Sequence, residues 1–281
     1  MDTPPFHFAR TDDGVNIAYW TLGKGPPVVI LNPPSLSHLA LEWTVPGMRR
    51  WYECMGNNHE VVRCNFRGTG LSPFTAVAIE IDEYVRDLET VIDAVTTGRV
   101  AILATGITGR IAAIYAARHP DRVDKLILFN AYLGTPDDDS GRRIIAAQSI
   151  AALGRDLWAR SLWWWFDPDG TDAAQNLPSL IVGSMTPAAY RSMVATLPVS
   201  SEVDAEAGML TAATLVVERR RNGDGSRRRT ATAASIPGSR LVTVPGSAMA
   251  PYFQNAEDIL QATLNFLSEE PVPEGLALRR P

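Results

Sequence analysis

The chain has 281 residues, of which 46% are hydrophobic and 20% charged, so it is long enough to bury a sizeable core as one domain with an insertion. Its net charge of -5 gives no electrostatic basis for binding nucleic acid, and its two cysteines are too few for a disulfide framework or a structural zinc site. No apolar run is long enough to cross a bilayer. We therefore predict a soluble cytoplasmic protein that binds neither nucleic acid nor membranes.

Short β-branched segments alternate with helical patterns along most of the chain, which is typical of a mostly parallel sheet covered by helices. Apolar residues at helical spacing predict two of these helices, at Asp82–Val95 and Arg110–Arg118, and both are expected to cover the sheet. Eight strands are predicted, at Phe6–Arg10, Asn16–Thr21, Pro27–Leu31, Glu60–Asn65, Val100–Ala104, Lys125–Phe129, Thr214–Val217 and Arg240–Val244.

The alternation stops between Leu133 and about Glu206, where helical patterns such as Ile144–Arg160 and Pro187–Leu197 dominate. We interpret residues 133–206 as an inserted helical cap. The core is then formed by residues 1–132 and 207–268. Residues 269–281 are rich in proline and charge and are predicted to form a flexible tail.

Two segments carry a family resemblance. Asn65–Ser72, with the sequence NFRGTGLS, directly follows a predicted strand and resembles the Asp-x-Arg-Gly-x-Gly-x-Ser turn of the α/β-hydrolase fold superfamily. The later segment LATGITGRIAAIYAARHPDRVDKLIL resembles that superfamily's nucleophile strand, elbow, following helix and next strand, in the same order. The resemblance runs from about Phe8 to Leu267. It implies an α/β-hydrolase fold, with a mostly parallel eight-stranded sheet flanked by helices and an inserted helical cap.

Hydrolysis on this fold needs a nucleophilic side chain on a strained strand-to-helix turn, within a Gly-x-Ser-x-Gly frame. When the segment is aligned on Arg118–Pro120, the frame falls on Ala104–Thr108 and the nucleophile position carries Gly106. A glycine eases a strained turn whatever the function of the protein. Because this one has no side chain, we interpret it as loss of the nucleophile.

The catalytic histidine of the superfamily lies in a Pro-Gly-x-x-His-x-Pro context after the last strand. Here Val244–Pro251 places Met249 at that position, and a thioether cannot shuttle protons. Of the four histidines, only His38 falls near the site, and it is the remaining candidate for proton transfer. The other three are predicted to be exposed residues with structural roles: His7, His59 and His119.

The catalytic acid of the superfamily follows the strand at Thr214–Val217 or, in some members, the strand ending near Phe129. In this chain those positions offer Asn222 or Asp224 and Asn130, respectively. The arginines of the same region, at 219–221 and 227–229, are most simply a solvated loop.

An oxyanion hole takes one backbone N–H from the residue after the nucleophile and one from the turn after the third strand. Ile107 supplies the first. The second falls within Asn32–Ser35, where the register leaves open whether the position is Pro34, which has no N–H, or Ser35, which has one. Such a pair of donors stabilises an enolate or binds a ketone or quinone oxygen even without a nucleophile.

Aromatic residues are predicted around this site. The cap contains Trp158 and the run Trp163–Phe166, whose rings either line a cavity or pin the cap to the core. Together with Tyr132 and Met249, they predict an apolar pocket for a flat hydrophobic ligand. The predicted substrate-binding residues are Asn32, Pro34, Ser35, Gly106, Ile107, Tyr132, Trp158, Trp164 and Met249.

These predictions favour a non-hydrolytic enzyme of secondary metabolism that orients an aromatic or polyketide-like molecule for C–C coupling, cyclisation, elimination or cofactor-independent oxygenation. The alternative is a catalytically inactive ligand-binding or sensor protein, a pseudoenzyme. Esterase activity is the least favoured interpretation, because removal of triad members costs about three or more powers of ten in rate. We expect a hydrophobic small molecule as the partner and neither a cofactor nor a metal. The oligomeric state stays open, with a homodimer among the options.

Overall fold

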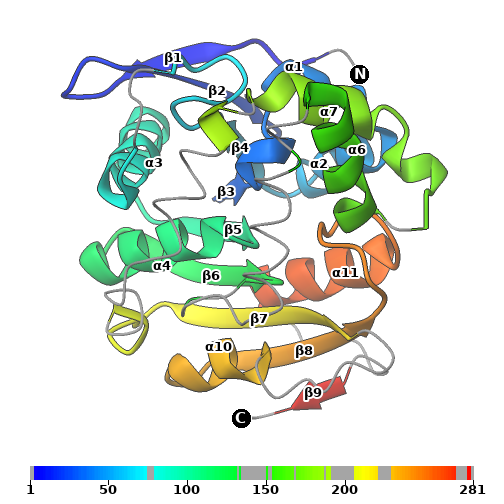
Figure 1. Cartoon of the computed structure of the whole chain (residues 1–281). Coiled ribbons are helices and arrows are strands. Elements are labelled where there is room, and N and C mark those ends of the chain that lie inside the picture. The colour runs from blue at the N-terminus through cyan, green and yellow to red at the C-terminus, as the bar shows by residue number, and fades with distance from the viewer. Residues whose placement is uncertain are drawn as a thin grey trace.

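The computed structural model describes residues 3–74, 79–131, 133, 150, 154–167, 169–186, 188–190, 206–220, 229–269 and 277–279. These residues form a nine-stranded sheet in the order β1-β2-β4-β3-β5-β6-β7-β8-β9 (Figure 1). The strands are β1 (His7–Arg10), β2 (Asn16–Leu22), β3 (Pro27–Leu31), β4 (Glu60–Cys64), β5 (Val100–Thr105), β6 (Val123–Phe129), β7 (Ala213–Arg220), β8 (Arg240–Pro245) and β9 (Ala277–Arg279).

Six neighbouring strands, from β4 through β3 and β5 to β8, run parallel. The outer strands are antiparallel: β2 to both β1 and β4, and β9 to β8. All eight predicted strands are confirmed. The prediction of a flexible tail is wrong at Ala277–Arg279, because these residues form β9 and pair with β8. That pairing satisfies backbone groups that an edge strand would otherwise leave open.

The described helices are α1 (Leu39–Glu42), α2 (Pro46–Met55), α3 (Ile81–Val95), α4 (Thr108–Arg118), α6 (Arg155–Phe166), α7 (Leu177–Ser184), α10 (Arg229–Ser235) and α11 (Ala256–Leu267), with short 3-10 turns η1 (Pro34–Leu36) and η2 (Asp172–Ala174). The helices α3 and α4 confirm the two predicted near Asp82–Val95 and Arg110–Arg118. They pack against each other, and so do α2 and α11. The parallel strands are thereby buried under helices, as their continuous apolar sequences require.

Part of the predicted cap is described. The helix α7 contacts α1 and η1, and α6 packs against α7, so these two helices lie beside the segment that follows β3 (Figure 1). The predicted helical stretches Ile144–Arg160 and Pro187–Leu197 fall largely outside the described residues, and α6 begins at Arg155.

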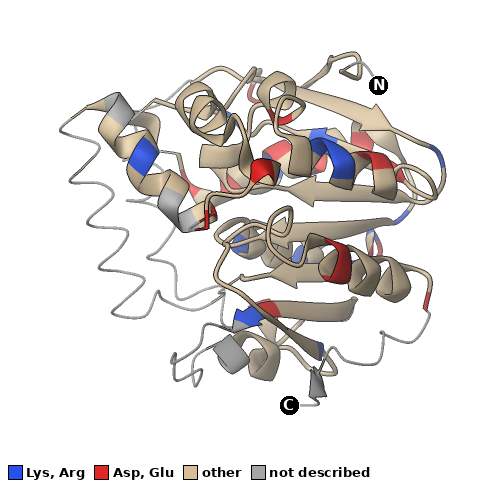
Figure 2. Ribbon diagram, turned by 90° about the vertical axis from the view of Figure 1, so that its right-hand side faces the viewer, with Lys and Arg blue, Asp and Glu red and all other residues tan. Residues whose placement is uncertain are grey.

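Charged positions of both signs are interspersed along the helices and strands (Figure 2). No helix among the described residues combines the length and the apolar character needed to span a bilayer.

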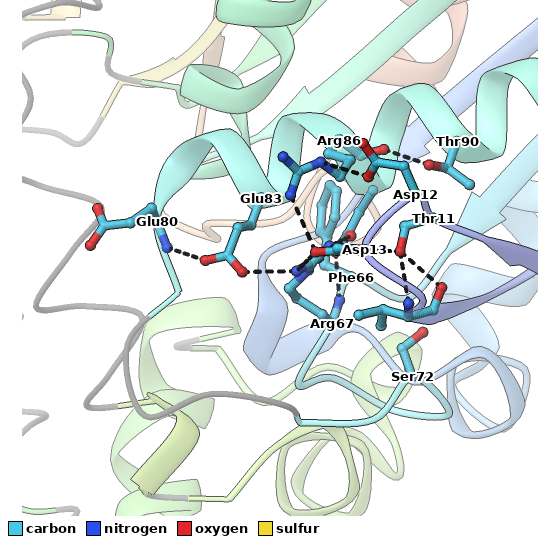
Figure 3. Close-up of polar contacts among 12 residues, drawn as sticks. Thr11, Asp12, Asp13, Phe66, Arg67, Ser72, Glu80, Glu83, Arg86 and Thr90 are labelled. Atoms are coloured by element: carbon cyan, nitrogen blue, oxygen red, sulfur yellow. Dashed lines mark hydrogen bonds and ion pairs between the residues drawn. The ribbon is translucent and has the colours of Figure 1, made fainter.

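The turn after β4 is organised by a buried arginine (Figure 3). The Arg67 side chain is 1% exposed, and its guanidinium contacts three carboxylates, at 2.6 Å for Asp87 and 2.8 Å for both Asp13 and Glu83. The Arg67 backbone N–H also donates to Asp87 Oδ2 at 2.9 Å. Arg67, the arginine of the Asn65–Ser72 turn, therefore joins the end of β4 to α3 and to the β1–β2 connection.

The same turn supports the segment after β3 through Asn65. Its Oδ1 accepts from the Leu71 N–H at 3.0 Å and from the Leu39 N–H at 3.4 Å. Its Nδ2 donates to Ser37 Oγ at 3.0 Å. The turn thus anchors the chain directly after η1, which places it in the scaffold of the candidate site.

Acid is expected to weaken this cluster through Asp13. A hydrogen bond from Arg67 and a second from Thr11 hold the pKa of Asp13 well below its ordinary value of 3.8. A carboxyl whose pKa is lowered by folding stabilises the native state above its unfolded pKa and loses that contribution as the pH falls toward the native value. We expect the melting-temperature difference between the wild-type chain and Asp13→Asn to shrink as the pH falls below about 4. Thermal denaturation at stepped pH tests this, and a difference that grows on acidification would contradict it.

A cluster of five large aromatic side chains fills the core beside β2 and α2. Trp20 meets Trp43 at 5.9 Å and Tyr52 at 5.3 Å between ring centroids, both edge to face. Tyr252, from the loop before α11, meets Tyr52 at 5.7 Å and Trp51 at 5.6 Å. All five rings are buried. The cluster joins the start of the chain to the loop that carries Met249.

Candidate functional site

Gly106 lies at the turn between β5 and α4, where the superfamily holds its nucleophile. Its φ is +61°, a left-handed value that glycine adopts at little cost, and its N–H donates to the Phe129 carbonyl at 3.0 Å. A Cβ built on Gly106 would have only Pro33 Cγ within 4 Å among the described residues, at 4.0 Å. The tight turn of the elbow is therefore kept, and among the described residues the position of a side chain is open.

The two threonines of the elbow do not replace the missing side chain. Thr108 Oγ accepts from the Thr105 N–H at 3.1 Å and lies 3.0 Å from the Leu31 carbonyl, to which it donates. This hydroxyl holds the turn against β3. Thr105 is fully buried, and its hydroxyl has no partner among the described residues.

The backbone N–H groups of Ile107, at the start of α4, and of Ser35, within η1, have no hydrogen-bond acceptor among the described residues. The hydrogen bonds of η1 use other donors, Leu36 to the Pro33 carbonyl at 2.7 Å and Ser37 to the Pro34 carbonyl at 3.3 Å. Of the two register options, only Ser35 has an N–H to offer. Pro33, the residue before η1, has its Cγ 4.0 Å from a Cβ built on Gly106, so the start of η1 lies beside the elbow.

Met249 lies in the loop between β8 and α11, which we call the Met249 loop (residues 246–255). Its side chain is half-buried and packs against the core. Asn130, directly after β6, donates from Nδ2 to the carbonyls of Ala248 at 3.3 Å and Met249 at 3.5 Å. Asn130 Oδ1 accepts from the Arg219 N–H at 2.9 Å. Asn130 occupies one of the predicted acid positions, and its side-chain amide joins the backbone of β7 to the backbone of the Met249 loop.

Arg219 contradicts the prediction of a solvated arginine loop. It lies inside β7 and is 1% exposed. Its guanidinium donates to the carbonyls of Pro245, Phe253 and Gln254, at both ends of the Met249 loop. Burial lowers the pKa of Arg219 to about 10, and the nearby Asp167 carboxylate opposes that shift. The strand continues past Val217, and carbonyl groups of a distant loop replace water around the cation.

Asn32, one of the predicted substrate-binding residues, has its side chain in a buried hydrogen-bond network. It is 1% exposed, donates to the Tyr52 hydroxyl at 2.9 Å and accepts from the Tyr252 hydroxyl. Tyr52 in turn donates to Glu42 Oε2 at 2.7 Å, and Glu42 pairs with Arg63 at 2.6 Å. Both ends of the Asn32 amide are used, so this side chain positions the segment that precedes η1.

His38 caps the N-terminus of α1, with Nδ1 accepting from the Leu41 N–H at 3.4 Å. Burial lowers its pKa, which favours the neutral ring. His59 was predicted to be exposed and is 6% exposed, because it lies between β3 and β4 at the buried start of β4. His7 stacks near Tyr19, and His119 stacks on Tyr115 at the end of α4, so both have structural contacts.

The structure also describes the burial of several other residues predicted to contact a ligand. Pro34 is buried, Ile107 is half-buried, and Trp158 is 0% exposed with its ring 5.2 Å from Tyr190. The position of Trp158 favours the alternative that the cap aromatics pack into the core. Tyr132, Asn222, Asp224 and the side chain of Trp164 lie outside the described residues.

Sequence comparison relates the chain to proteins of one fold. A profile described as alpha/beta hydrolase fold matches residues 46–167. The AB hydrolase superfamily protein YisY of Bacillus subtilis (strain 168) is 27% identical over 127 residues, which are 44% of this chain and 45% of that protein. The match therefore spans less than half of that relative's length.

Solved structures superpose over nearly the whole chain. An enol-lactonase from Burkholderia xenovorans LB400 gives a TM-score of 0.75 at 18% identity, covering 93% of this chain and 100% of that chain. An esterase from Exiguobacterium antarcticum gives 0.78 at 20% identity, covering 95% and 100%. A bromoperoxidase from Bacillus anthracis gives 0.75 at 19% identity, covering 94% and 100%. At these identities the similarity is one of fold, since one fold hosts many activities.

Proposed function

We propose that this chain, which has the α/β-hydrolase fold, acts on a hydrophobic, carbonyl-bearing small molecule without hydrolysing it. The observation that carries the proposal is the elbow at Gly106, which keeps the left-handed turn while leaving the nucleophile position open among the described residues. The backbone N–H groups of Ile107 and Ser35, which have no acceptor among the described residues, support a site that binds an oxygen atom.

The proposed chemistry rests on backbone donors and shape. The Ile107 and Ser35 N–H groups would bind a ketone or quinone oxygen and stabilise negative charge that develops on it. The apolar side chains of Pro33, beside Gly106, and of Ile107, next to it in the chain, support a hydrophobic ligand of aromatic or polyketide type. Reactions that need orientation and carbonyl polarisation fit this arrangement: C–C coupling, cyclisation, elimination and cofactor-independent oxygenation.

A ligand-binding protein without turnover is the second candidate, favoured by the same missing side chain. Incubation with a panel of aromatic ketones, quinones and polyketides, followed by tryptophan quenching and mass spectrometry, separates the two. Saturable quenching with new products supports the enzyme. Saturable quenching with every compound returned unchanged would contradict the enzyme proposal and support the binding protein.

Removing one donor is expected to weaken binding of a carbonyl ligand. Ser35→Pro deletes the N–H at a position early in η1, where proline is accepted, whereas Ser35→Ala keeps the N–H and deletes only the hydroxyl. We expect the affinity for 1,4-naphthoquinone, measured by fluorescence quenching, to fall about two- to tenfold in Ser35→Pro, the range of one hydrogen bond. Ser35→Ala should match the wild-type chain. Equal losses in both variants would remove Ser35 from the oxyanion site.

A further inference from the structure

The segment that joins α6 to α7 packs directly on the Met249 loop. We call it the α6–α7 connection (residues 167 and 169–176). A Cβ on Gly47, at the start of α2, would lie 2.7 Å from the Tyr252 carbonyl oxygen and 3.0 Å from the Ala173 carbonyl oxygen. The backbone of the connection, the backbone of the loop and the start of α2 therefore meet without room for a side chain.

One side-chain amide bonds to both segments. Gln254 Oε1 accepts from the N–H groups of Ser247 and Ala248, each at 2.8 Å, and so shapes the loop just before Met249. Gln254 Nε2 donates to the Asp169 carboxylate in the connection. An amide carries an acceptor at one end and donors at the other, which suits it to this double role.

The ends of the loop are held separately. Arg219 donates to Pro245, Phe253 and Gln254 carbonyls, and its buried guanidinium lies close enough to Asp167 for their charges to interact. With the ends fixed by Arg219, the conformation of the middle depends on Gln254 and Asn130. A movement of Asp169 therefore acts on the part of the loop that carries Met249.

We propose that the α6–α7 connection and the Met249 loop open and close as one unit, with the Gln254 amide as the residue that couples them. Protein segments open in cooperative groups, and a shared hydrogen-bond network is a physical route for that cooperation. A ligand that displaces the predicted cap then also moves Met249. This role in regulating the site rests on the proposed function, whereas the coupling itself is measurable without a ligand.

A donor–acceptor exchange tests the coupling. Gln254→Glu keeps the oxygen that accepts from Ser247 and Ala248 but loses the donor to Asp169. Adding Asp169→Asn restores the hydrogen bond with donor and acceptor reversed. We expect Gln254→Glu to raise amide hydrogen exchange about two- to tenfold in peptides from both the loop and the connection, and the double variant to return both to wild-type rates.

Asp172→Asn is the matched control, because Asp172 is an exposed acid of the same connection with no described contact to the loop. It should leave exchange in the loop unchanged. Faster exchange confined to one segment, or a double variant that does not recover, overturns the coupling. If Gln254→Glu does not fold, Asp169→Ala applies the same test from the other side. The two proposals can fail separately. If no compound is turned over but hydrogen exchange in the variants changes as expected, the proposed function is wrong and the coupling holds.

Discussion

Replacing Gly106 with serine and Met249 with histidine together is expected to give the chain esterase activity, if the wild-type chain is non-hydrolytic as we propose. The elbow has space for the serine side chain, with only Pro33 Cγ near its Cβ among the described residues, at 4.0 Å. The left-handed backbone costs about 1–2 kcal/mol for a residue other than glycine, which a folded domain tolerates. A positioned general base contributes ~10²–10⁴ in rate. We therefore expect the double variant to hydrolyse p-nitrophenyl acetate at least about a hundredfold faster than either single variant.

The matched control is Gly106→Ala with Met249→His, which has the same backbone strain and the same imidazole but no nucleophile. It should remain inactive, and a serine-directed phosphonate should block only the serine-bearing double variant. Ester hydrolysis by the wild-type chain that the phosphonate abolishes would show a nucleophile elsewhere and refute the loss of the triad. Equal activity in the alanine control would show that the added hydrolysis does not pass through position 106.

Replacing Arg63 with methionine should cost about 3–5 kcal/mol of folding free energy, because it leaves Glu42 as a buried charge without its cation. Both side chains are 0% exposed, and the guanidinium contacts the carboxylate at 2.6 and 2.9 Å. Tyr52 would be left as a single donor to that carboxylate. Urea denaturation measures the loss as a change in the midpoint at constant slope.

Two further variants separate burial from charge in this prediction. Glu42→Leu combined with Arg63→Met removes the orphan carboxylate and should recover part of the loss. Arg50→Met breaks an ion pair with Glu257 whose side chains are 74% and 79% exposed, and it should change stability by less than about 1 kcal/mol. A loss of similar size in Arg50→Met and Arg63→Met would contradict the buried network.

The fold could be predicted from the sequence because its strands are short runs of apolar residues, a pattern typical of buried strands. The elbow was accessible for a different reason: Gly106 is identified by its register against Arg118–Pro120, which is local. The helix α2 was not predicted, although Pro46 at its start is an ordinary helix-initiation signal. The strand β9 was also missed, since pairing with β8 depends on tertiary position and not on the composition of the tail.

The side-chain roles that sequence analysis missed depend on partners far away in the chain. Arg219 sits in a run of arginines that resembles a solvated loop, and only the fold brings the Phe253 and Gln254 carbonyls to it. Asn32 is the first residue of the predicted oxyanion segment Asn32–Ser35, and its amide bonds to Tyr52 and Tyr252. In each case a buried polar group bonds to residues far away in the sequence, which local spacing does not encode.

The aromatic cluster beside β2 has an optical consequence. Indole and phenol rings held edge to face at 5.3–5.9 Å are close enough for their electronic transitions to couple, so the folded chain should show strong near-ultraviolet circular dichroism. That signal disappears when side-chain packing is lost, even where helices persist. Because Tyr52 and Tyr252 bond to Asn32 and Tyr252 belongs to the Met249 loop, the same bands report without any label on the segment before η1 and on the Met249 loop.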